Sequence, residues 1–344
     1  MVSDESADDE SFSLFPTQAP AIPQKLTERL SASDLAFRAI ARSGGVVVLV
    51  LMVAVGSFLA FRAVQALRKA GWSFLTTQAW NPDAGGFGIA AVMVGTILIA
   101  LVAIVVAVPL AMGAALYISE YAPRRIQRFL ISLVDLMAAV PSIVFGLWGF
   151  WFLEWRMTSL SRWINDWFGW FPLFKVNGVG RNQTGPTATF YTSSSFIAGV
   201  VVALMVVPIA CSIMREAFSQ APVGEREGAY ALGATRWGMI RIVVLPFARG
   251  AMIGGTMLGL GRALGETIAV SLIISPVFVI QPHLLQNGTS SISSLIALHY
   301  AEATPFGVSA LMAAGLALFG LTLLVNFLAA VIVSRSRSGA VSEA

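Results

Sequence analysis

The chain has 344 residues, of which 57% are hydrophobic and 12% are charged, and its mean hydropathy is +0.78. Soluble domains carry about 25% charged residues, so a soluble enzyme, a secreted disulfide scaffold and a disordered regulator are all excluded. The net charge of +4 does not indicate nucleic-acid binding, because the basic residues flank apolar runs, where they set membrane orientation. The single cysteine, Cys211, lies in an apolar run and cannot form an internal disulfide.

The first part of the chain is polar. Residues 1–24 contain five acidic side chains followed by three prolines. A secretory signal needs a basic segment directly before a short apolar stretch, and this segment has neither. We therefore expect residues 1–42 to form a cytoplasmic polar tail that is disordered at its start, and the first apolar span to act as an uncleaved signal anchor.

Long uncharged runs predict a chain that crosses a membrane several times. Glu266 and Glu302, for example, bracket 35 uncharged residues, whereas about 18 are enough to cross a bilayer. Backbone polar groups must be bonded internally in lipid, and the runs are too continuous for barrel strands, so we expect an all-α membrane domain over residues 43–334. The six predicted spans are 43–65, 88–118, 128–153, 195–214, 248–275 and 307–333.

The distribution of Lys and Arg predicts that both termini lie in the cytoplasm. The segments assigned to the inner side hold 14 of these residues, and those assigned to the outer side hold 7. The inner segments include the loop 215–249 and a tail over 335–344.

The longest outer loop, 154–195, begins with an aromatic segment. Trp163, Trp167 and Trp170 have the spacing of one helix face. Such a stripe could stack a ligand, but more often it anchors a short helix at the headgroup level of the bilayer, which is the interpretation we favour. The rest of the loop, residues 172–194, is rich in Gly, Asn, Thr and Ser and is predicted to be exposed.

The inner loop contains the segment with the clearest local structure, residues 225–250. Helix-forming residues run up to Leu232, and Gly233 then supplies the left-handed residue that ends a helix. Thr235 can cap a second helix, which is predicted to stop at Pro246. A compact pair of helices with several charges, on the inner side of the membrane, indicates a surface for a partner protein.

This segment resembles the EAA signature of ATP-binding-cassette importer permeases. Five residues separate Glu227 from Gly233, and nine more precede Val243-x-Leu245-Pro246; Gly228 and Val243 are slight departures. In that family the short helix around the glycine inserts into a cleft of a cytoplasmic ATPase. The resemblance thus implies ATPase coupling by seven residues: Glu227, Gly228, Ala229, Gly233, Ala234, Leu245 and Pro246.

Three further stretches narrow the resemblance. LYISEYAP (116–123), DLMAAVPSIVFGLWG (135–149) and LGLGRALGETIAV (258–270) are similar to phosphate-specific permeases of the PstC type. The resemblance covers about 88–334 and implies the type I importer permease (MetI-like) fold and the bacterial plasma membrane. It also implies a PstA-type second permease, a PstB-type ATPase homodimer and an extracytoplasmic PstS-type phosphate-binding protein. ATP and Mg²⁺ would be used by the ATPase, and no cofactor would be bound by this chain.

Beyond Arg249 at its inner end, the charged residues of the fifth predicted span are Arg262 and Glu266, four positions apart and so expected on one helix face. Each costs about 2.5–3.5 kcal/mol at the centre of a membrane helix, whereas a pair at this spacing returns only about 0.2–0.5 kcal/mol. A structural ion pair therefore explains them poorly, and we expect both to line a transport path, where Arg262 replaces the lost hydration of an oxyanion. Nearby glycines are expected to let helices approach closely: Gly254, Gly255, Gly259, Gly261 and Gly265.

Two other acidic residues need an explanation. Asp135 is a weak candidate for the path, because an acid in the first turn of a helix is explained by the helix dipole. Glu120 lies at the inner interface and is expected to pair with Arg124 or Arg125.

Alternative functions stay open. The chain could be a permease for another oxyanion such as sulfate or molybdate, an ion-coupled secondary transporter, or a membrane scaffold or sensor. An ion-coupled transporter leaves the EAA segment without a role. The sequence contains no GxxxxGK[ST] nucleotide-binding pattern, no nucleophile–base arrangement and no metal-ligand cluster, so we expect no catalytic residue and an energy source in another protein.

Overall fold

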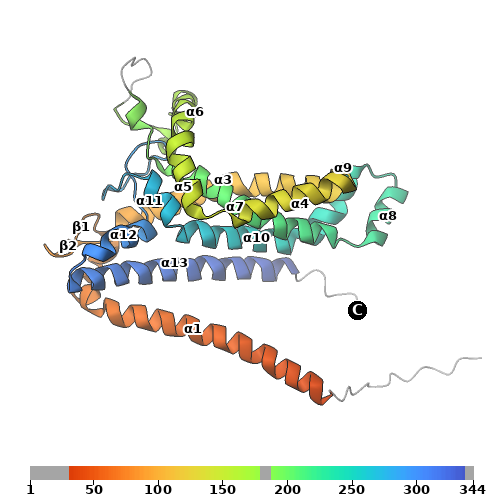
Figure 1. Cartoon of the computed structure of the whole chain (residues 1–344), viewed down its shortest axis with the longest axis horizontal. Coiled ribbons are helices and arrows are strands. Elements are labelled where there is room, and N and C mark those ends of the chain that lie inside the picture. The colour runs from red at the N-terminus through yellow and green to blue at the C-terminus, as the bar shows by residue number, and fades with distance from the viewer. Residues whose placement is uncertain (1–30, 179–186, 338–344) are drawn as a thin grey trace, which may run out of the picture. The chain divides into compact units, whose positions relative to one another are not determined.

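The computed structural model describes residues 31–178 and 187–337, which are mostly α-helical (Figure 1). Five continuous helical segments in these ranges are long and apolar enough to cross a membrane, and a bent pair of helices supplies a sixth. The long helices are α1 (Ala32–Ala70), α3 (Ala90–Leu116), α4 (Arg124–Ala139), α7 (Ser195–Ser219), α10 (Leu245–Gly265) and α13 (Pro305–Arg337). The predicted all-α class is confirmed.

Shorter elements connect and extend these helices. The short α-helices are α2 (Ser73–Thr76), α5 (Ser142–Trp148), α6 (Glu154–Phe168), α8 (Val223–Ala231), α9 (Arg236–Met239), α11 (Ile268–Ile273) and α12 (Ile292–His299). Three π-helical turns continue longer helices: η1 (Tyr117–Tyr121), η2 (Gly149–Leu153) and η5 (Ile240–Val244). The 3₁₀ turns are η3 (Pro172–Phe174), η4 (Thr187–Phe190) and η6 (Tyr300–Glu302). Strands β1 (Trp80–Asn81) and β2 (Gly86–Phe87) pair antiparallel, with Trp80 opposite Phe87.

The chain divides after Val53 into two units, and α1 crosses this division. Helix α1 begins at Ala32, so residues 32–42 of the predicted polar tail are helical, while residues 1–30 lie outside the described residues. At the other end α13 continues to Arg337, so residues 335–337 of the predicted tail are helical, and residues 338–344 lie outside the described ranges. The packing described below belongs to the second unit, residues 54–337.

Helix α7 lies at the centre of this second unit, against α3, α4 and α10. A Cβ at Gly199 would clash with Val102 of α3, so these two helices are in close contact. Gly255 and Gly259 of α10 face Ile213 and Val206 of α7 in the same way. The predicted close approach is thus confirmed for two of the five glycines around Arg262, whereas Cβ atoms at the other three would meet nothing within 4 Å in the described structure.

The third predicted span, 128–153, is not a single helix. Helix α4 ends at Ala139, and the following segment Ser142–Phe168 is turned by 90°. The cause is Pro141, which disfavours a helical residue before it, and Val140 is accordingly extended, with a ψ of 128°. Pro141, Pro109 and Pro208 were all expected to break helices. The break occurs at Pro141, whereas α3 and α7 continue through Pro109 and Pro208.

The fifth predicted span, 248–275, has different ends from those expected. Helix α9 continues through η5 into α10, so the second inner helix does not stop at Pro246. In the π turn before this proline the Leu245 amide donates a hydrogen bond to the carbonyl of Ile240, five residues back. Pro246 then lies in the first turn of α10, where the missing amide of a proline is tolerated. The outer end of α10 is Gly265, ten residues earlier than predicted.

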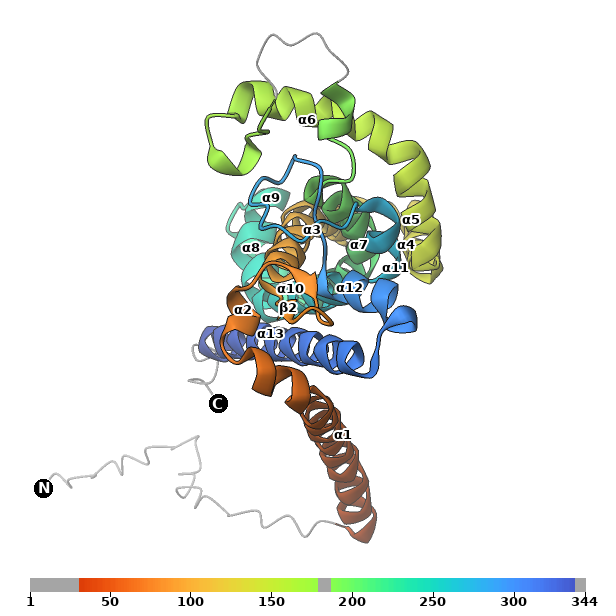
Figure 2. The same ribbon diagram turned by 90° about the vertical axis from the view of Figure 1, so that its left-hand side faces the viewer.

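The inner and outer segments lie at opposite ends of the helices. Helices α8 and α9 are at one end of α3, α7 and α10, whereas α6, α12 and the strands are at the other (Figure 1). Viewed from that second end, α5 and α6 follow a curved path across the group rather than along it (Figure 2). This separation agrees with the assignment of 215–249 and 154–195 to opposite sides of the membrane.

Part of the predicted exposed outer loop is buried, and its residues 179–186 lie outside the described ranges. Trp163, Trp167 and Trp170 are exposed, but α6 ends at Phe168, so Trp170 does not continue the predicted helical stripe. In the predicted exposed stretch, Tyr191 is fully buried and its hydroxyl accepts a hydrogen bond from the Asn165 side-chain amide at 3.2 Å. Burial raises the pKa of the Tyr191 hydroxyl, so it remains protonated at neutral pH.

The packing of α10 on α7 gives a test with a matched control. Gly259→Val should lower the melting temperature of the purified protein in detergent, because the added side chain overlaps Val206 and overpacking costs about 1–3 kcal/mol. Gly254→Val places the same residue in the same helix at an open position and controls for the helix propensity of valine. Equal losses at both positions would show that the contact with α7 is not specific.

Candidate functional site

The inner segment folds as two helices joined by a tight turn, as predicted. Helix α8 ends at Ala231, and Gly233 has a φ of +82°, the left-handed conformation that a glycine adopts without strain. The side-chain oxygen of Thr235 then accepts a hydrogen bond from the Gly238 amide at 3.1 Å and caps α9. The direction of the chain at this turn is therefore fixed by local interactions.

Three of the seven EAA residues lie on an open surface. Glu227, Gly228 and Gly233 are exposed, and a Cβ at either glycine would meet nothing within 4 Å in the described structure. Leu232, next to Gly233, is 91% exposed. The turn after α8 therefore presents charged, small and apolar residues together at the surface.

The other EAA residues join this surface to the helices. Ala229 and Leu245 are half-buried and pack against the cluster of buried residues between α3, α7 and η5. Ala234 is half-buried in the turn, and Pro246, which is exposed, lies at the start of α10. The segment thus has one face in contact with the membrane domain and one face free.

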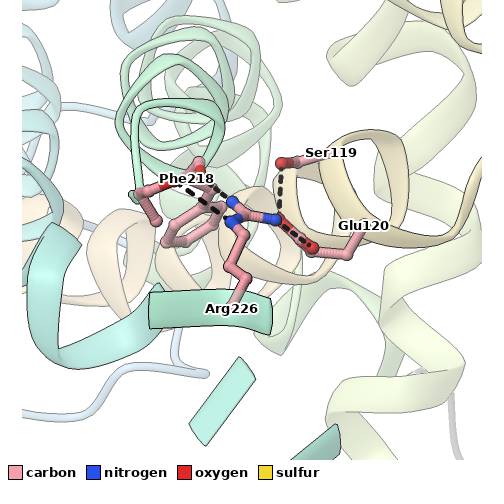
Figure 3. Close-up of polar contacts among 5 residues, drawn as sticks. Ser119, Glu120, Phe218 and Arg226 are labelled. Atoms are coloured by element: carbon pink, nitrogen blue, oxygen red, sulfur yellow. Dashed lines mark hydrogen bonds and ion pairs between the residues drawn. The ribbon is translucent and has the colours of Figure 1, made fainter. Parts of the chain in front are cut away.

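Arg226 joins α8 to two other helices (Figure 3). Its guanidinium donates to the Glu120 carboxylate at 2.9 Å and to the backbone carbonyls of Phe218 and Ala221 at 2.5 and 3.2 Å. The other oxygen of Glu120 accepts a hydrogen bond from the Ser119 hydroxyl at 3.0 Å. The Glu120 side chain is 4% exposed, so its charge depends on Arg226 for compensation.

This ion pair corrects the prediction for Glu120, whose partner is Arg226 rather than Arg124 or Arg125. The two residues are 106 positions apart, so spacing along one helix could not reveal them. The available signal was a lone carboxylate at the end of a long uncharged run, which needs a cation if it is buried. A second contact also joins the inner segment to η1: the Arg236 guanidinium of α9 lies 4.9 Å from the Tyr121 ring centroid.

Arg262 lies on an exposed strip of α10 that runs beside the glycines packed on α7. Four exposed residues follow one face of the helix at intervals of one turn: Gly254, Leu258, Arg262 and Gly265. In the described structure no carboxylate pairs with Arg262. An unpaired guanidinium on a span with a long apolar window is favourable only where water, an anion or another subunit meets it.

Glu266 does not share this helix face, contrary to prediction. It follows the last residue of α10 in an extended conformation, with a ψ of 125°, and is half-buried. The Ser293 hydroxyl donates to the carbonyl of Glu266 at 2.8 Å, and the Thr267 hydroxyl donates to that of Gly265 at 3.1 Å. These two hydroxyls satisfy carbonyls that the end of the helix has freed, which makes a break within a span tolerable.

Asp135 is exposed on α4 and lies twelve residues into this 16-residue helix, so its predicted place in the first turn is wrong. The helix begins at Arg124, four residues before the predicted start of the span, which moves Asp135 towards the opposite end. A favourable interaction with the helix dipole therefore does not explain its charge. In the described structure it has no ion-pair partner.

The sequence matches known transport proteins. Residues 107–338 match the family described as binding-protein-dependent transport system inner membrane component. The chain is 37% identical over 321 residues to the phosphate transport system permease protein PstC 2 of Mycobacterium tuberculosis, covering 92% of this chain and 95% of the relative. It is 38% identical over 308 residues to the phosphate transport system permease protein PstC of Xylella fastidiosa, covering 89% and 92%.

Two solved structures have a similar fold. An inward-facing structure of the MetNI methionine ABC transporter superposes with a TM-score of 0.50 at 15% identity, covering 72% of this chain and 95% of the other. A bacterial ABC transporter that imports the acidic polysaccharide alginate gives a TM-score of 0.53 at 16% identity, covering 87% and 98%. These structures confirm the predicted importer-permease fold and, at such identities, nothing beyond the fold.

The cap of α9 can be tested by hydrogen exchange. Thr235→Ala should speed exchange of the amides in the first turn of α9, including that of Gly238, because loss of an N-cap costs about 0.5–2 kcal/mol. Thr235→Ser retains the side-chain oxygen and should keep the exchange slow. Equal exchange in both variants would mean that contacts of α9 with the membrane domain, rather than the cap, hold this turn.

Proposed function

Because the chain belongs to the family of binding-protein-dependent transport system inner membrane components, we propose that it is the PstC-type transmembrane subunit of an ATP-driven phosphate importer. Members of this family are permease subunits rather than enzymes. In the proposed complex this chain pairs with a PstA-type permease, a homodimer of PstB-type ATPases and a PstS-type phosphate-binding protein. It lies in the bacterial plasma membrane with both termini in the cytoplasm.

The observation that carries this proposal is the free face of α8 and the turn after it. Glu227, Gly228, Gly233 and Leu232 are exposed there, on a segment that Arg226 fixes to the membrane domain. A surface held rigidly on one side and open on the other suits a subunit that receives force from a partner. The sequence has no nucleotide-binding pattern of its own, which supports placing ATP and Mg²⁺ on the partner ATPase.

Phosphate as the substrate is supported by the names of the relatives and by the chemistry of Arg262. A guanidinium presents planar, paired donors that fit a tetrahedral oxyanion, and it remains charged at any physiological pH. Arg262 is exposed and has no carboxylate partner in the described structure, so its donors are free for an anion. The same chemistry fits sulfate, and only a substrate assay separates the two anions.

The proposed path runs along the exposed face of α10. Gly254 and Gly265 have no side chains, so they leave space along this face. The second permease would close that space into a pathway that Arg262 lines. The break after Gly265 places Glu266 at one end of this face, where discontinuous helices in transporters commonly form ion sites. Glu266 would act there as a gate, and the exposed Asp135 on α4 is kept as a weaker candidate for the path.

Transport follows from alternating access. Phosphate released from the binding protein on the outer side would enter and meet Arg262. Closure of the ATPase dimer on the inner side would move α8 and reverse access, and phosphate would leave to the cytoplasm. Binding at Arg262 must be moderate, because an anion that is held tightly is not released.

Reconstitution tests the coupling role. Proteoliposomes that contain this chain and its three proposed partner proteins should take up phosphate only when ATP is supplied, and Glu227→Lys or Gly233→Val should abolish this uptake. Gly233→Val forces a branched residue into a left-handed conformation, and the lysine reverses the charge on the free face. Uptake without the ATPase would instead indicate an ion-coupled transporter, and no uptake by the unmodified complex would favour a scaffold or sensor.

Arg262 is tested by uptake at equal complex abundance. Arg262→Ala should abolish ATP-driven phosphate uptake while ATPase assembly is retained, because the substitution removes the guanidinium and leaves α8 unchanged. Leu258→Ala, one turn earlier on the same exposed face, is the matched control and should retain uptake. Normal phosphate uptake by Arg262→Ala would exclude the path role, and preferred uptake of sulfate by the unmodified complex would correct the substrate.

A further inference from the structure

We infer that Arg226 is the positioning residue that makes α8 move as one body with the inner ends of α3 and α7. The inference rests on the proposed function and extends it from the docking surface to a residue that faces away from the partner. The EAA residues provide the contact with the ATPase, whereas Arg226 determines what that contact moves.

The Arg226 side chain connects α8 to several other elements. Arg226 belongs to α8, Glu120 to the π turn that ends α3, and Phe218 to the last turn of α7. A third bond, to the carbonyl of Ala221, fixes the turn between α7 and α8. All three bonds come from one planar group, so a rotation of α8 about its own axis that exceeds the reach of the Arg226 side chain breaks at least one of them.

The ion pair between Arg226 and Glu120 is largely buried. The side chains of Arg226 and Glu120 are 19% and 4% exposed, so the pair has little contact with water. Separation would leave the Glu120 carboxylate buried without a cation, which is strongly unfavourable. The pair therefore holds its geometry under load, whereas an exposed pair would exchange with water.

The packing of α7 provides the route along which a displacement of α8 continues into the membrane domain. Helix α7 packs on α3 through Gly199 and on α10 through Gly255 and Gly259. A displacement of α8 that reaches α3 and α7 through Arg226 therefore reaches the helix that carries Arg262. Without Arg226, the connections of α8 to the membrane domain are the covalent chain and apolar packing, including that of Ala229.

Arg226→Lys is the informative substitution, because it retains the positive charge and loses the planar group that bonds three acceptors at once. Glu120→Gln retains size and hydrogen bonding and removes the charge. Arg241→Lys is the matched control: Arg241 is an exposed arginine in η5 of the same loop, outside the Arg226 network. The readouts are phosphate transported per ATP hydrolysed in proteoliposomes, ATPase retention in the purified complex, and a spin-label distance.

For the distance, labels are attached at Gly224→Cys on α8 and Tyr117→Cys on η1, in a Cys211→Ala background. Both positions are exposed, and a side chain at Gly224 meets nothing within 4 Å in the described structure. The chain with Arg226 should give one narrow distance distribution. Arg226→Lys should broaden it, because α8 then samples several orientations.

We expect Arg226→Lys and Glu120→Gln each to retain the ATPase and to lower phosphate transported per ATP by at least about fivefold, the lower end of the usual coupling between sites. The double variant should be no worse than either single variant, because both remove one interaction. Arg241→Lys should match the unmodified complex in every readout.

Unchanged coupling and a narrow distribution in Arg226→Lys would overturn the inference. Loss of coupling with an unchanged distribution, or loss of the ATPase itself, would also overturn it, because Arg226 would then act at the docking contact. If Arg226→Lys does not accumulate, Glu120→Gln decides by the same criteria. If the unmodified complex shows no ATP-driven uptake, the proposed function fails, and the distance distributions still decide whether Arg226 positions α8.

Discussion

Helices in a bilayer gain nothing by hiding apolar side chains from lipid, so their association depends on close approach between backbones. In the second unit of this chain that approach is concentrated on α7. Gly199 of α7 meets Val102 of α3, and Gly255 and Gly259 of α10 meet α7 at two successive turns. Because α3, α4 and α10 all lie against this one helix, the positions of the coupling loop and of the Arg262 face are both defined relative to α7.

Arg226 and Arg262 illustrate opposite uses of charge in a protein with few charges. Arg226 is largely buried and has all its interactions within the chain, so it contributes geometry. Arg262 is exposed and has no carboxylate partner in the described ranges, so it is available for interaction with something outside the chain. The cost of a charge near lipid is offset in the first case by a carboxylate and in the second, we propose, by an anion in transit.

Hydropathy and local chemistry predicted much of this structure. The charge-free runs located the membrane-spanning segments, and Gly233 and Thr235 determined the turn after α8, because such features depend on neighbouring residues. The angle between the two parts of a broken helix and the contacts between residues far apart in the sequence were not predicted. Pro141 predicts a break but not its 90° angle, and no local rule links Glu120 to a partner 106 residues away. Pro246 was expected to end a helix because the rule assumes α-helical bonding, whereas a π turn precedes it.

That π turn sets the angle between the free surface of α8 and the exposed face of α10. An α-helix turns by about 100° per residue, so the one extra residue accommodated in η5 rotates everything before it by that amount relative to α10. Deletion of a single residue from Ile240–Val244 would leave both regions chemically intact and point them in different directions. The phase of one helix, set at η5, would thus decide whether the proposed ATPase at α8 and the proposed second permease at α10 can be engaged by the same molecule.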